Sequence, residues 1–422
     1  MRSYPLASLA PLALAALAAC SATGGSSVSP GGSGGTGSAG AGGMGGSLID
    51  AGNLDDDAAP PSTIGHLRGK VVAPEGTIPI SGALVYLTSS TPGAIPDGVF
   101  CDRCVQLGHA TPYTFTHADG TFDLPAYAEG SQKIVVQKGQ FRRVRDVTVV
   151  AGDTDVPRPV TTLPGKMDVA HGDTIPKMAL ITGAWDHIEM SLGKLGLAAG
   201  SYDKVENVFP PNFSDPMLPS NFLKTPATIG KYQIVFKPCS GSSGTTCDDF
   251  TSGDAAIQKT LQDWVAAGGK LYVTDYSYDY VRQPWPEYID WQGQTSEIGS
   301  ACLTGSYTVA ASVPDQGLAE WLAVQGIGSF DVKENWTRIS ALHAVATTDL
   351  DGNPTTVTPK VWVTGGSSPA TVSFERSCGR VLFSTYHTEE SYNGSSPLGA
   401  QELALLYVLL EVGVCITPPT VH

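Results

Sequence analysis

Residues 255–277, which read AAIQKTLQDWVAAGGKLYVTDYS, decide the fold of the second half of the chain. The first part predicts a helix that ends at Gly268 and Gly269, because glycine readily adopts the left-handed conformation that closes many helices. The run KLYVT at 270–274 is largely apolar and predicts a buried strand. A helix that leads directly into a buried strand is typical of an α/β domain with a largely parallel sheet.

The same alternation continues on both sides of this stretch. The further apolar strands and amphipathic helices are predicted at 177–186, 187–197, 232–239, 379–387 and 399–413. We therefore expect one α/β domain over 174–417. Residues 283–377 fit the alternation poorly, and their Gly- and Thr-rich strands predict a β-rich insertion.

The order of these elements resembles the class I glutamine amidotransferase-like superfamily, which includes enzymes and many sequences without known activity. The matching motifs are IGKYQIVFKPC at 229–239, LQDWVAAGGKLYVTD at 261–275 and GRVLFSTYHTEE at 379–390. The resemblance implies a flavodoxin-like α/β domain of three layers, with a sheet between two layers of helices.

Enzymes of that superfamily carry a cysteine, or in some relatives a serine, in a G-x-C-x-G turn after a strand. The corresponding turn here, DYSYD at 275–279, has neither a cysteine nor the flanking glycines. The family's H-x-E motif is matched by His387 and Glu389. The resemblance therefore implies a hydrolase with Ser277 as nucleophile, His387 as base and Glu389 as its orienting group. Without the glycines, a vestigial site or a ligand cleft is the preferred interpretation.

Cys239 is a second candidate nucleophile, because PCSGSSG follows a strand. It lies one strand too early in the family order, and Cys247 nearby would remove the thiol in a disulfide. Seven cysteines are present besides Cys20, and because the chain is expected to leave the reducing cytosol, we expect disulfides among them. Spacing favours the local pairs Cys101–Cys104 and Cys239–Cys247, and the pairing of Cys302, Cys378 and Cys415 stays open. The CxxC motif at 101–104 could supply only two ligands of a zinc site, and the sequence contains no second CxxC. We therefore expect no metal and no cofactor.

Five residues at the predicted carboxyl edge of the sheet are candidate cleft residues: Asp186, His187, Glu189, Asp275 and Tyr276. Open α/β sheets bind ligands at that edge. The alternative for the first three is an acidic helix start that complements the helix dipole. Aromatic side chains near a cleft would suit stacking on a sugar, although most tryptophans are expected in the core. A carbohydrate or a protein is therefore the partner class that we consider.

Residues 63–160 show short alternating strands separated by turns, which predicts a small antiparallel β-sandwich. Three motifs, GKVVAPEGTIPISGALVYLTSS, THADGTFDLPAYAEG and KIVVQKGQFRRVRDVTVVAGD, resemble the carboxypeptidase regulatory-like domain, a transthyretin-like or Ig-like sandwich. The resemblance implies a spacer or recognition module. An insertion at 91–112 contains CDRC and is longer than a hairpin needs.

The N-terminus predicts a bacterial lipoprotein. Residues 1–20 have a basic residue, a short apolar run and LAAC, which resembles a lipobox with Cys20 as the lipidated residue. Residues 21–62 are rich in Gly, Ser and Ala and predict a flexible tether. Ser21 after the cysteine favours the outer membrane or cell surface of a Gram-negative-type bacterium, with the lipid as the membrane anchor.

Charge narrows the function classes. The chain has 25 basic and 40 acidic residues and a net charge of -15, which argues against nucleic acid as a partner. The preferred function is non-catalytic binding of a ligand or partner at the cell envelope. The alternatives are a serine or cysteine hydrolase and an envelope scaffold or adhesion protein.

Overall fold

The computed structural model describes residues 61–102, 105–108, 110–183, 185–206, 214–240, 252–389, 397–410 and 416–417. Contacts divide the chain into one unit that ends at Asp55 and another that begins at Asp56, and the described residues all belong to the second. Cys20, the predicted signal peptide and the tether up to residue 60 lie outside the described residues. None of the helices in the described ranges is long and apolar enough to cross a membrane.

Residues 65–174 form two sheets whose buried side chains meet in one core. In β5, alternate residues Phe122, Leu124 and Ala126 are buried, as the period of a half-buried strand requires. The three-stranded sheet has the order β5 (Thr121–Ala126), β1 (Gly65–Lys70), β8 (Thr154–Asp155). The five-stranded sheet has the order β4 (Tyr113–Phe115), β2 (Leu84–Thr88), β6 (Gly130–Lys138), β7 (Phe141–Val149), β9 (Asp173–Thr174).

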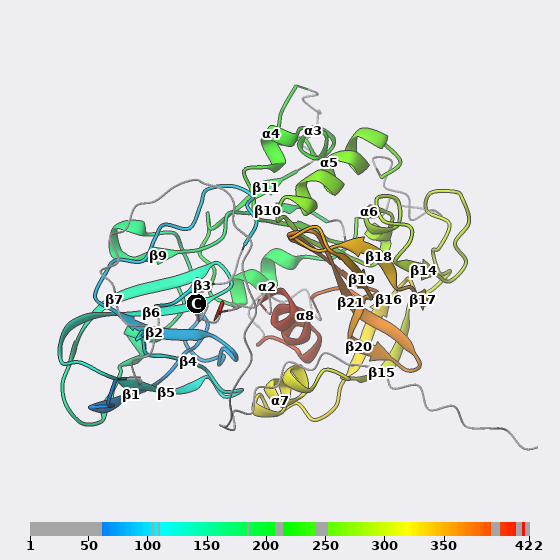
Figure 1. Cartoon of the computed structure of the whole chain (residues 1–422). Helices are drawn as coiled ribbons and strands as arrows, with labels where there is room; N and C mark the ends of the chain where they lie inside the picture. Colours follow the sequence, from blue (N-terminus) through cyan, green and yellow to red (C-terminus); the bar gives the residue numbers. More distant parts are fainter. Residues whose placement is uncertain are drawn as a thin grey trace, which may run out of the picture. The chain divides into compact units, whose positions relative to one another are not determined.

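The second half of the chain is built on a sheet of nine strands (Figure 1). Five neighbouring strands are parallel: β11 (Tyr202–Val205), β10 (Met178–Ile181), β12 (Ile234–Lys237), β13 (Lys270–Thr274) and β22 (Gly379–Ser384). Four antiparallel strands continue it: β21 (Ser368–Arg376), β20 (Lys360–Gly365), β15 (Tyr307–Ser312) and β16 (Asp331–Asn335). The predicted insertion at 283–377 therefore extends the central sheet.

Three pairs of short strands complete the strand set. They are β14 (Ile289–Trp291) with β17 (Ile339–Leu342), β18 (Val345–Thr348) with β19 (Pro354–Val357), and β3 (Val105–Gln106) with β23 (Ile416–Thr417). The last pair is parallel and brings the end of the chain to the insertion of the first segment.

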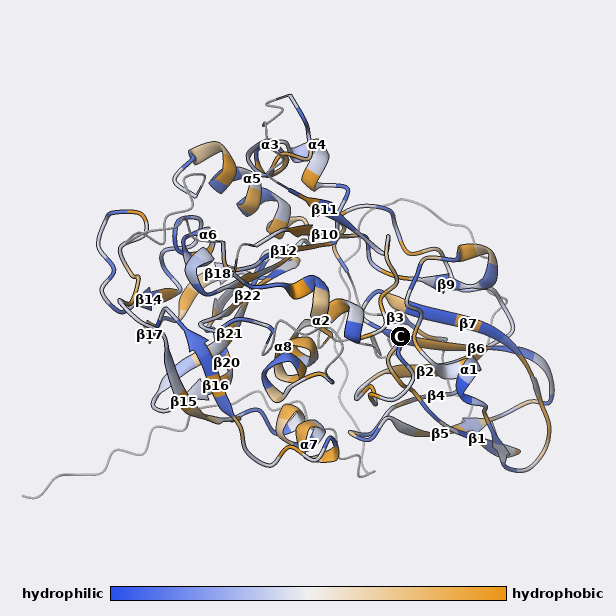
Figure 2. Cartoon of the chain, turned by 180° about the vertical axis from the view of Figure 1, so that it is seen from behind, coloured by the Kyte–Doolittle hydropathy of each residue, from blue (hydrophilic) through white to orange (hydrophobic). Residues whose placement is uncertain are grey.

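Helices cover both faces of the nine-stranded sheet (Figure 1). Alternate residues of one strand show this: Leu180 of β10 packs with α2, α7 and α8, whereas Ala179 packs with α3 and α5. Figure 2 shows that α5, α7 and α8 carry both apolar and polar residues. The helices are α1 (Arg158–Thr161), η1 (Val169–His171), α2 (Ile188–Lys194), α3 (Pro219–Lys224), α4 (Pro226–Ile229), α5 (Ala255–Ala266), η2 (Asp275–Tyr278), α6 (Asp279–Arg282), α7 (Gln316–Val324) and α8 (Ala400–Leu410).

The predicted helix before β13 is confirmed. Asp254 caps the start of α5 by accepting a 2.9 Å hydrogen bond from the Ala256 N–H. The helix ends at Ala266, and Gly268 follows with a φ of +119°. A Cβ at Gly268 would lie only 1.9 Å from the Phe100 carbonyl oxygen, so this turn requires glycine for space as well as for conformation.

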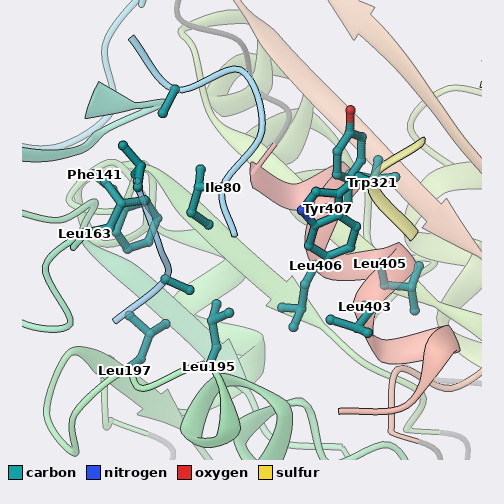
Figure 3. Close-up of a cluster of buried hydrophobic side chains, with 14 of the residues drawn as sticks. Ile80, Phe141, Leu163, Leu195, Leu197, Trp321, Leu403, Leu405, Leu406 and Tyr407 are labelled. Atoms are coloured by element: carbon teal, nitrogen blue, oxygen red, sulfur yellow. The ribbon is translucent and has the colours of Figure 1, made fainter. Parts of the chain in front are cut away.

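The first segment and the nine-stranded sheet share one hydrophobic core. Figure 3 shows Ile80 and Phe141 of the first segment in the same cluster as Leu195 and Trp321 of the second. The Trp321 indole N–H also donates a 2.7 Å hydrogen bond to the Pro79 carbonyl. The two segments are therefore packed together through buried apolar surface.

One disulfide crosses between the two segments. Cys101 is bonded to Cys378, 277 residues away, and the predicted Cys101–Cys104 pair is wrong. The physical reason is tertiary, since residues 100–101 lie against the Gly268 turn, where the Cys378 N–H also donates to the Ala266 carbonyl. Cys104 itself lies outside the described residues. Cys302 is also disulfide-bonded.

Candidate functional site

Three side chains meet where neighbouring parallel strands end. Cys239 follows β12, Asp275 follows β13 and His387 follows β22. Because these strands are adjacent and parallel, their carboxyl ends lie at one edge of the sheet. A thiol sulfur, a carboxylate oxygen and a ring nitrogen from the three residues all lie within 4.8 Å of one another. All three residues are buried, with exposures of 1%, 0% and 5%.

Asp275 is the first residue of the turn at 275–279, in which the family resemblance placed the nucleophile. Its φ is +47°, a left-handed conformation that costs free energy in a residue other than glycine and that clusters at functional sites. Its Oδ1 accepts 3.1 Å hydrogen bonds from the Trp336 N–H and the Thr337 hydroxyl. Its Oδ2 lies 3.3 Å from His387 Nε2. The turn therefore presents a carboxylate to the histidine.

The Asp275 and His387 pair is electrostatically coupled. Burial raises the pKa of Asp275 to about 6, although the His387 ring opposes this shift. Burial alone would lower the pKa of His387, but its electrostatic interactions with Asp275 and the neighbouring Cys239 outweigh burial, and the pKa of His387 rises. Each of the two residues therefore favours the charged form of the other.

Cys239 is a free thiol, so the predicted Cys239–Cys247 disulfide is wrong. Cys247 itself lies outside the described residues. The physical reason is that Cys239 is held against the neighbouring strand β13. Its N–H donates a 2.9 Å hydrogen bond to the Thr274 hydroxyl at the end of that strand. Burial raises the pKa of the Cys239 thiol, and the His387 ring lowers it in part.

Ser277, predicted as a nucleophile, has a hydroxyl that is engaged by the loop after β12. Its hydroxyl donates a 2.8 Å hydrogen bond to the Pro238 carbonyl and accepts one of 3.1 Å from Lys237 Nζ. Only 1% of the residue is exposed. Ser277 therefore anchors the peptide next to Cys239, because its hydroxyl is already committed to the backbone of that loop.

Glu389 is not the residue that orients His387, because Asp275 occupies that place. Both Glu389 carboxylate oxygens are buried and make no hydrogen bond within the described structure. Burial raises the pKa of Glu389, and the nearby His187 and Lys194 oppose the shift. The H-x-E motif thus contributes His387 to the site and directs Glu389 toward α2.

Asp186, predicted as a cleft residue, is a fully buried acceptor. Its Oδ2 accepts hydrogen bonds from the Thr274 hydroxyl at 2.7 Å and the Thr388 N–H at 3.0 Å. Thr274 precedes Asp275, and Thr388 follows His387. Since the Thr274 hydroxyl also accepts from the Cys239 N–H, Asp186 connects the three strand ends that carry the buried trio.

The remaining predicted cleft residues lie around the trio without joining it. His187 Nδ1 and Glu189 Oε1 are 3.6 Å apart and partly exposed. Tyr276 donates a 3.2 Å hydrogen bond to the Leu303 carbonyl and contacts the Trp336 ring, with 5.7 Å between centroids. These three side chains therefore belong to the rim of the same sheet edge.

The sequence contains the signal that would have identified the trio. Each member lies at or shortly after the end of an apolar strand, in VFKPC, YVTD and STYH. Among the described residues this is the one group of three Cys, His, Asp or Glu side chains whose ligand atoms lie within 4.8 Å of one another. In the family that the sequence resembles, the nucleophile follows the strand that here precedes Asp275. Cys239 follows the strand before that one, and for this reason it was not predicted as the nucleophile.

A cavity of about 770 Å³ lies elsewhere, at the amino ends of β10 and β11. Lys177, Met178 and Tyr202 line it, together with Ile95 and Pro96 of the first-segment insertion. None of the buried trio lines this cavity. It is therefore separate from the candidate site.

Comparison with known proteins finds no matching family model and no curated protein with a similar sequence. Solved structures with similarity include a cytoplasmic protein from Salmonella typhimurium, at 11% identity and a TM-score of 0.34 over 56% of this chain and 98% of that one. A Thermoplasma acidophilum protein assigned to GMP synthase has 9% identity and a TM-score of 0.33, over 56% and 94%. A ThuA-like protein from Bacteroides uniformis has 11% identity and a TM-score of 0.32, over 55% and 89%. At TM-scores below 0.5, these remain similarities only.

Proposed function

We propose that the chain is a lipoprotein, anchored to the outer membrane or cell surface through Cys20, whose glutamine amidotransferase-like domain carries out thiol-dependent acyl transfer or hydrolysis. The first segment, as a carboxypeptidase regulatory-like sandwich, supports that domain. One observation carries the catalytic proposal. A free cysteine, a histidine and an aspartate converge at the ends of three adjacent strands.

Each residue has a role in this chemistry. Cys239 Sγ attacks the carbonyl carbon of an ester or amide, and His387 transfers the thiol proton to the leaving group. Asp275 orients the ring and stabilises the imidazolium, which the raised pKa of His387 supports. Water then hydrolyses the thioester and restores the thiol.

The surrounding hydrogen bonds support a preorganised site. Asp275 is fixed through Oδ1 by Trp336 and Thr337, so Oδ2 remains directed at the histidine. The Cys239 backbone is fixed by Thr274 on the adjacent strand. Side chains held in this way lose little conformational freedom when a substrate binds.

The test is alkylation of the native full-length protein by iodoacetamide, with the labelled residue identified by mass spectrometry. We expect Cys239 to react, and we expect His387→Gln to slow the reaction by about a hundredfold, the usual size of a general-base contribution. His343→Gln is the matched control, because that histidine is partly exposed and pairs with Asp290 at 2.7 Å. Labelling of Cys239 only after unfolding would reject thiol catalysis.

Non-catalytic ligand binding is the second candidate, and the burial of Cys239 favours it. A thiol with 1% exposure and a raised pKa is largely protonated and shielded from reagents. The alkylation experiment separates the two functions, since a structural thiol would react at the same slow rate in the wild type and in His387→Gln.

A further inference from the structure

We propose that Cys239, Asp275 and His387 bind a single Zn²⁺-class divalent ion through Sγ, Oδ2 and Nε2. The inference concerns metal binding and does not require thiol catalysis. It rests on the chemistry of the three side chains, on their spacing and on two buried atoms that lack partners.

The ligand chemistry fits a borderline-soft transition metal. Thiolate, imidazole and carboxylate are the three ligand types that zinc sites use in proteins. Hard cations such as Mg²⁺ and Ca²⁺ prefer sets made of oxygen alone. Because the trio has one sulfur, one nitrogen and one oxygen, it favours Zn²⁺, Co²⁺ or a similar ion.

The spacing fits a tetrahedral ion. With metal–ligand bonds of about 2.0 to 2.3 Å, two ligand atoms of such an ion lie about 3.3 to 3.6 Å apart. Asp275 Oδ2 and His387 Nε2 already lie 3.3 Å apart. Since every pair in the trio lies within 4.8 Å, the Cys239 sulfur reaches the ion by a shift of at most about 1.5 Å.

The hydrogen bonding of the site points to a missing partner. Asp275 Oδ2 and His387 Nε2 are buried, and despite their short separation neither makes a hydrogen bond with any described group. Buried polar atoms in native proteins nearly always have a partner, so two adjacent exceptions need an explanation. A bound cation would contact both atoms at once.

The second layer of contacts also fits a metal site. Asp275 Oδ1 accepts from Trp336 and Thr337, which leaves Oδ2 as the available oxygen. Thr274 fixes the Cys239 backbone on one side, and Asp186 fixes Thr274 in turn. Such outer contacts orient the ligands of metal sites.

Metal binding would regulate the thiol. A bound Zn²⁺ holds Cys239 as a thiolate and His387 as a neutral imidazole, and the protons displaced from the thiol and from the His387 ring go to solvent. The thiolate is then no longer free to attack a carbonyl carbon. Three protein ligands leave the fourth position of a tetrahedral ion for water or a small ligand.

The test is titration of tag-free, chelator-treated full-length protein in detergent with Co²⁺ and then with Zn²⁺. We expect one equivalent of Co²⁺ to bind with a thiolate-to-cobalt charge-transfer absorption, and Zn²⁺ to displace it. Cys239→Ser should abolish this absorption, and Asp275→Asn and His387→Gln should each weaken binding at least about tenfold. His343→Gln should bind as the wild type does.

Two outcomes would overturn the inference: no charge-transfer absorption in the folded wild type, or binding that is unchanged in Cys239→Ser. A further measurement uses the wild-type protein alone and so does not depend on whether a variant folds. One equivalent of Zn²⁺ should slow alkylation of Cys239 at least about tenfold relative to the metal-free protein. If the metal-free thiol does not react, the cobalt absorption still tests the metal site while the catalytic proposal fails.

Discussion

The two ends of the parallel strands differ in how their buried polar groups are paired. At the amino ends, Gln233 accepts from the Lys177 N–H and donates to the Pro96 carbonyl, and Lys270 faces Asp102 at 3.6 Å. At the carboxyl ends, Asp275 Oδ2 and His387 Nε2 have no hydrogen-bond partner among the described residues. The amino ends are built for attachment to the first segment, whereas the carboxyl ends retain unused bonding capacity for a ligand.

The largest expected effect lies at the amino ends. Cys378→Ser should lower the free energy of unfolding by about 4 kcal/mol, because it removes a cross-link that closes a long loop. Urea denaturation under non-reducing conditions measures the change. Cys101→Ser and the double variant should show the same loss. An unchanged unfolding midpoint would mean that the amino ends do not depend on this bond.

The next effect lies at the carboxyl ends. Asp186→Ala should cost about 3 kcal/mol of unfolding free energy, because the hydroxyl of Thr274 and the N–H of Thr388 lose their buried acceptor. Thr274→Val removes the hydroxyl that donates to Asp186 and accepts from the Cys239 N–H, and should cost about 2 kcal/mol. A double-mutant cycle by urea denaturation gives the coupling between the two residues. Additive effects would contradict a role for Asp186 in joining the strand ends.

A smaller loss is expected for Asp275→Asn, at about 1 kcal/mol, because Asn retains the oxygen that accepts from Trp336 and Thr337. Urea denaturation at pH 8 measures this change in the free energy of unfolding. If the carboxyl ends of the strands serve to bind a ligand, this variant loses metal binding while it retains most of its stability. A loss as large as that of Asp186→Ala would show that Asp275 is mainly structural.

The smallest effect is a pH dependence at the amino ends. Burial lowers the pKa of Lys270 to about 8, although Asp102 opposes the shift. The unfolded state therefore binds more protons above pH 8, and this residue makes stability rise with pH up to its unfolded pKa. Between pH 8 and 8.5 this contribution rises by about 0.5 kcal/mol. Lys270→Met should remove it, and identical pH profiles would refute the assignment.

Much of the fold could be predicted because its signals are local. The helix at 255–266 and the strand at 270–274 follow from apolar spacing, an Asp cap and two glycines. The order of the strands could not be predicted, since β13 pairs with β22 and β15 pairs with β20 across long stretches of the chain. The Cys101–Cys378 bond escaped prediction for the same reason, because spacing along the chain favours near neighbours.

The candidate site was predicted in part. The H-x-E motif singled out His387, which lies 3.3 Å from Asp275, and the predicted turn at 275–279 does follow β13. The partners were assigned wrongly because the motif gives sequence order, whereas the contacts depend on which strands are adjacent. Since β12, β13 and β22 are neighbours, Cys239 and Asp275 reach His387, and Ser277 points back to the Pro238 carbonyl.

The Cys101–Cys378 bond has a consequence for how the protein is made. Cys101 leaves the ribosome 277 residues before its partner, which at about 5 to 20 residues per second is an interval of roughly 15 to 55 s. During that interval the nearest thiol in the sequence is Cys104, so a bond formed early joins the wrong pair. The native bond then requires thiol–disulfide exchange after nearly the whole chain has been synthesised. Where the chain meets oxidising conditions during synthesis, its folding therefore depends on the rearrangement of disulfides as well as on their formation.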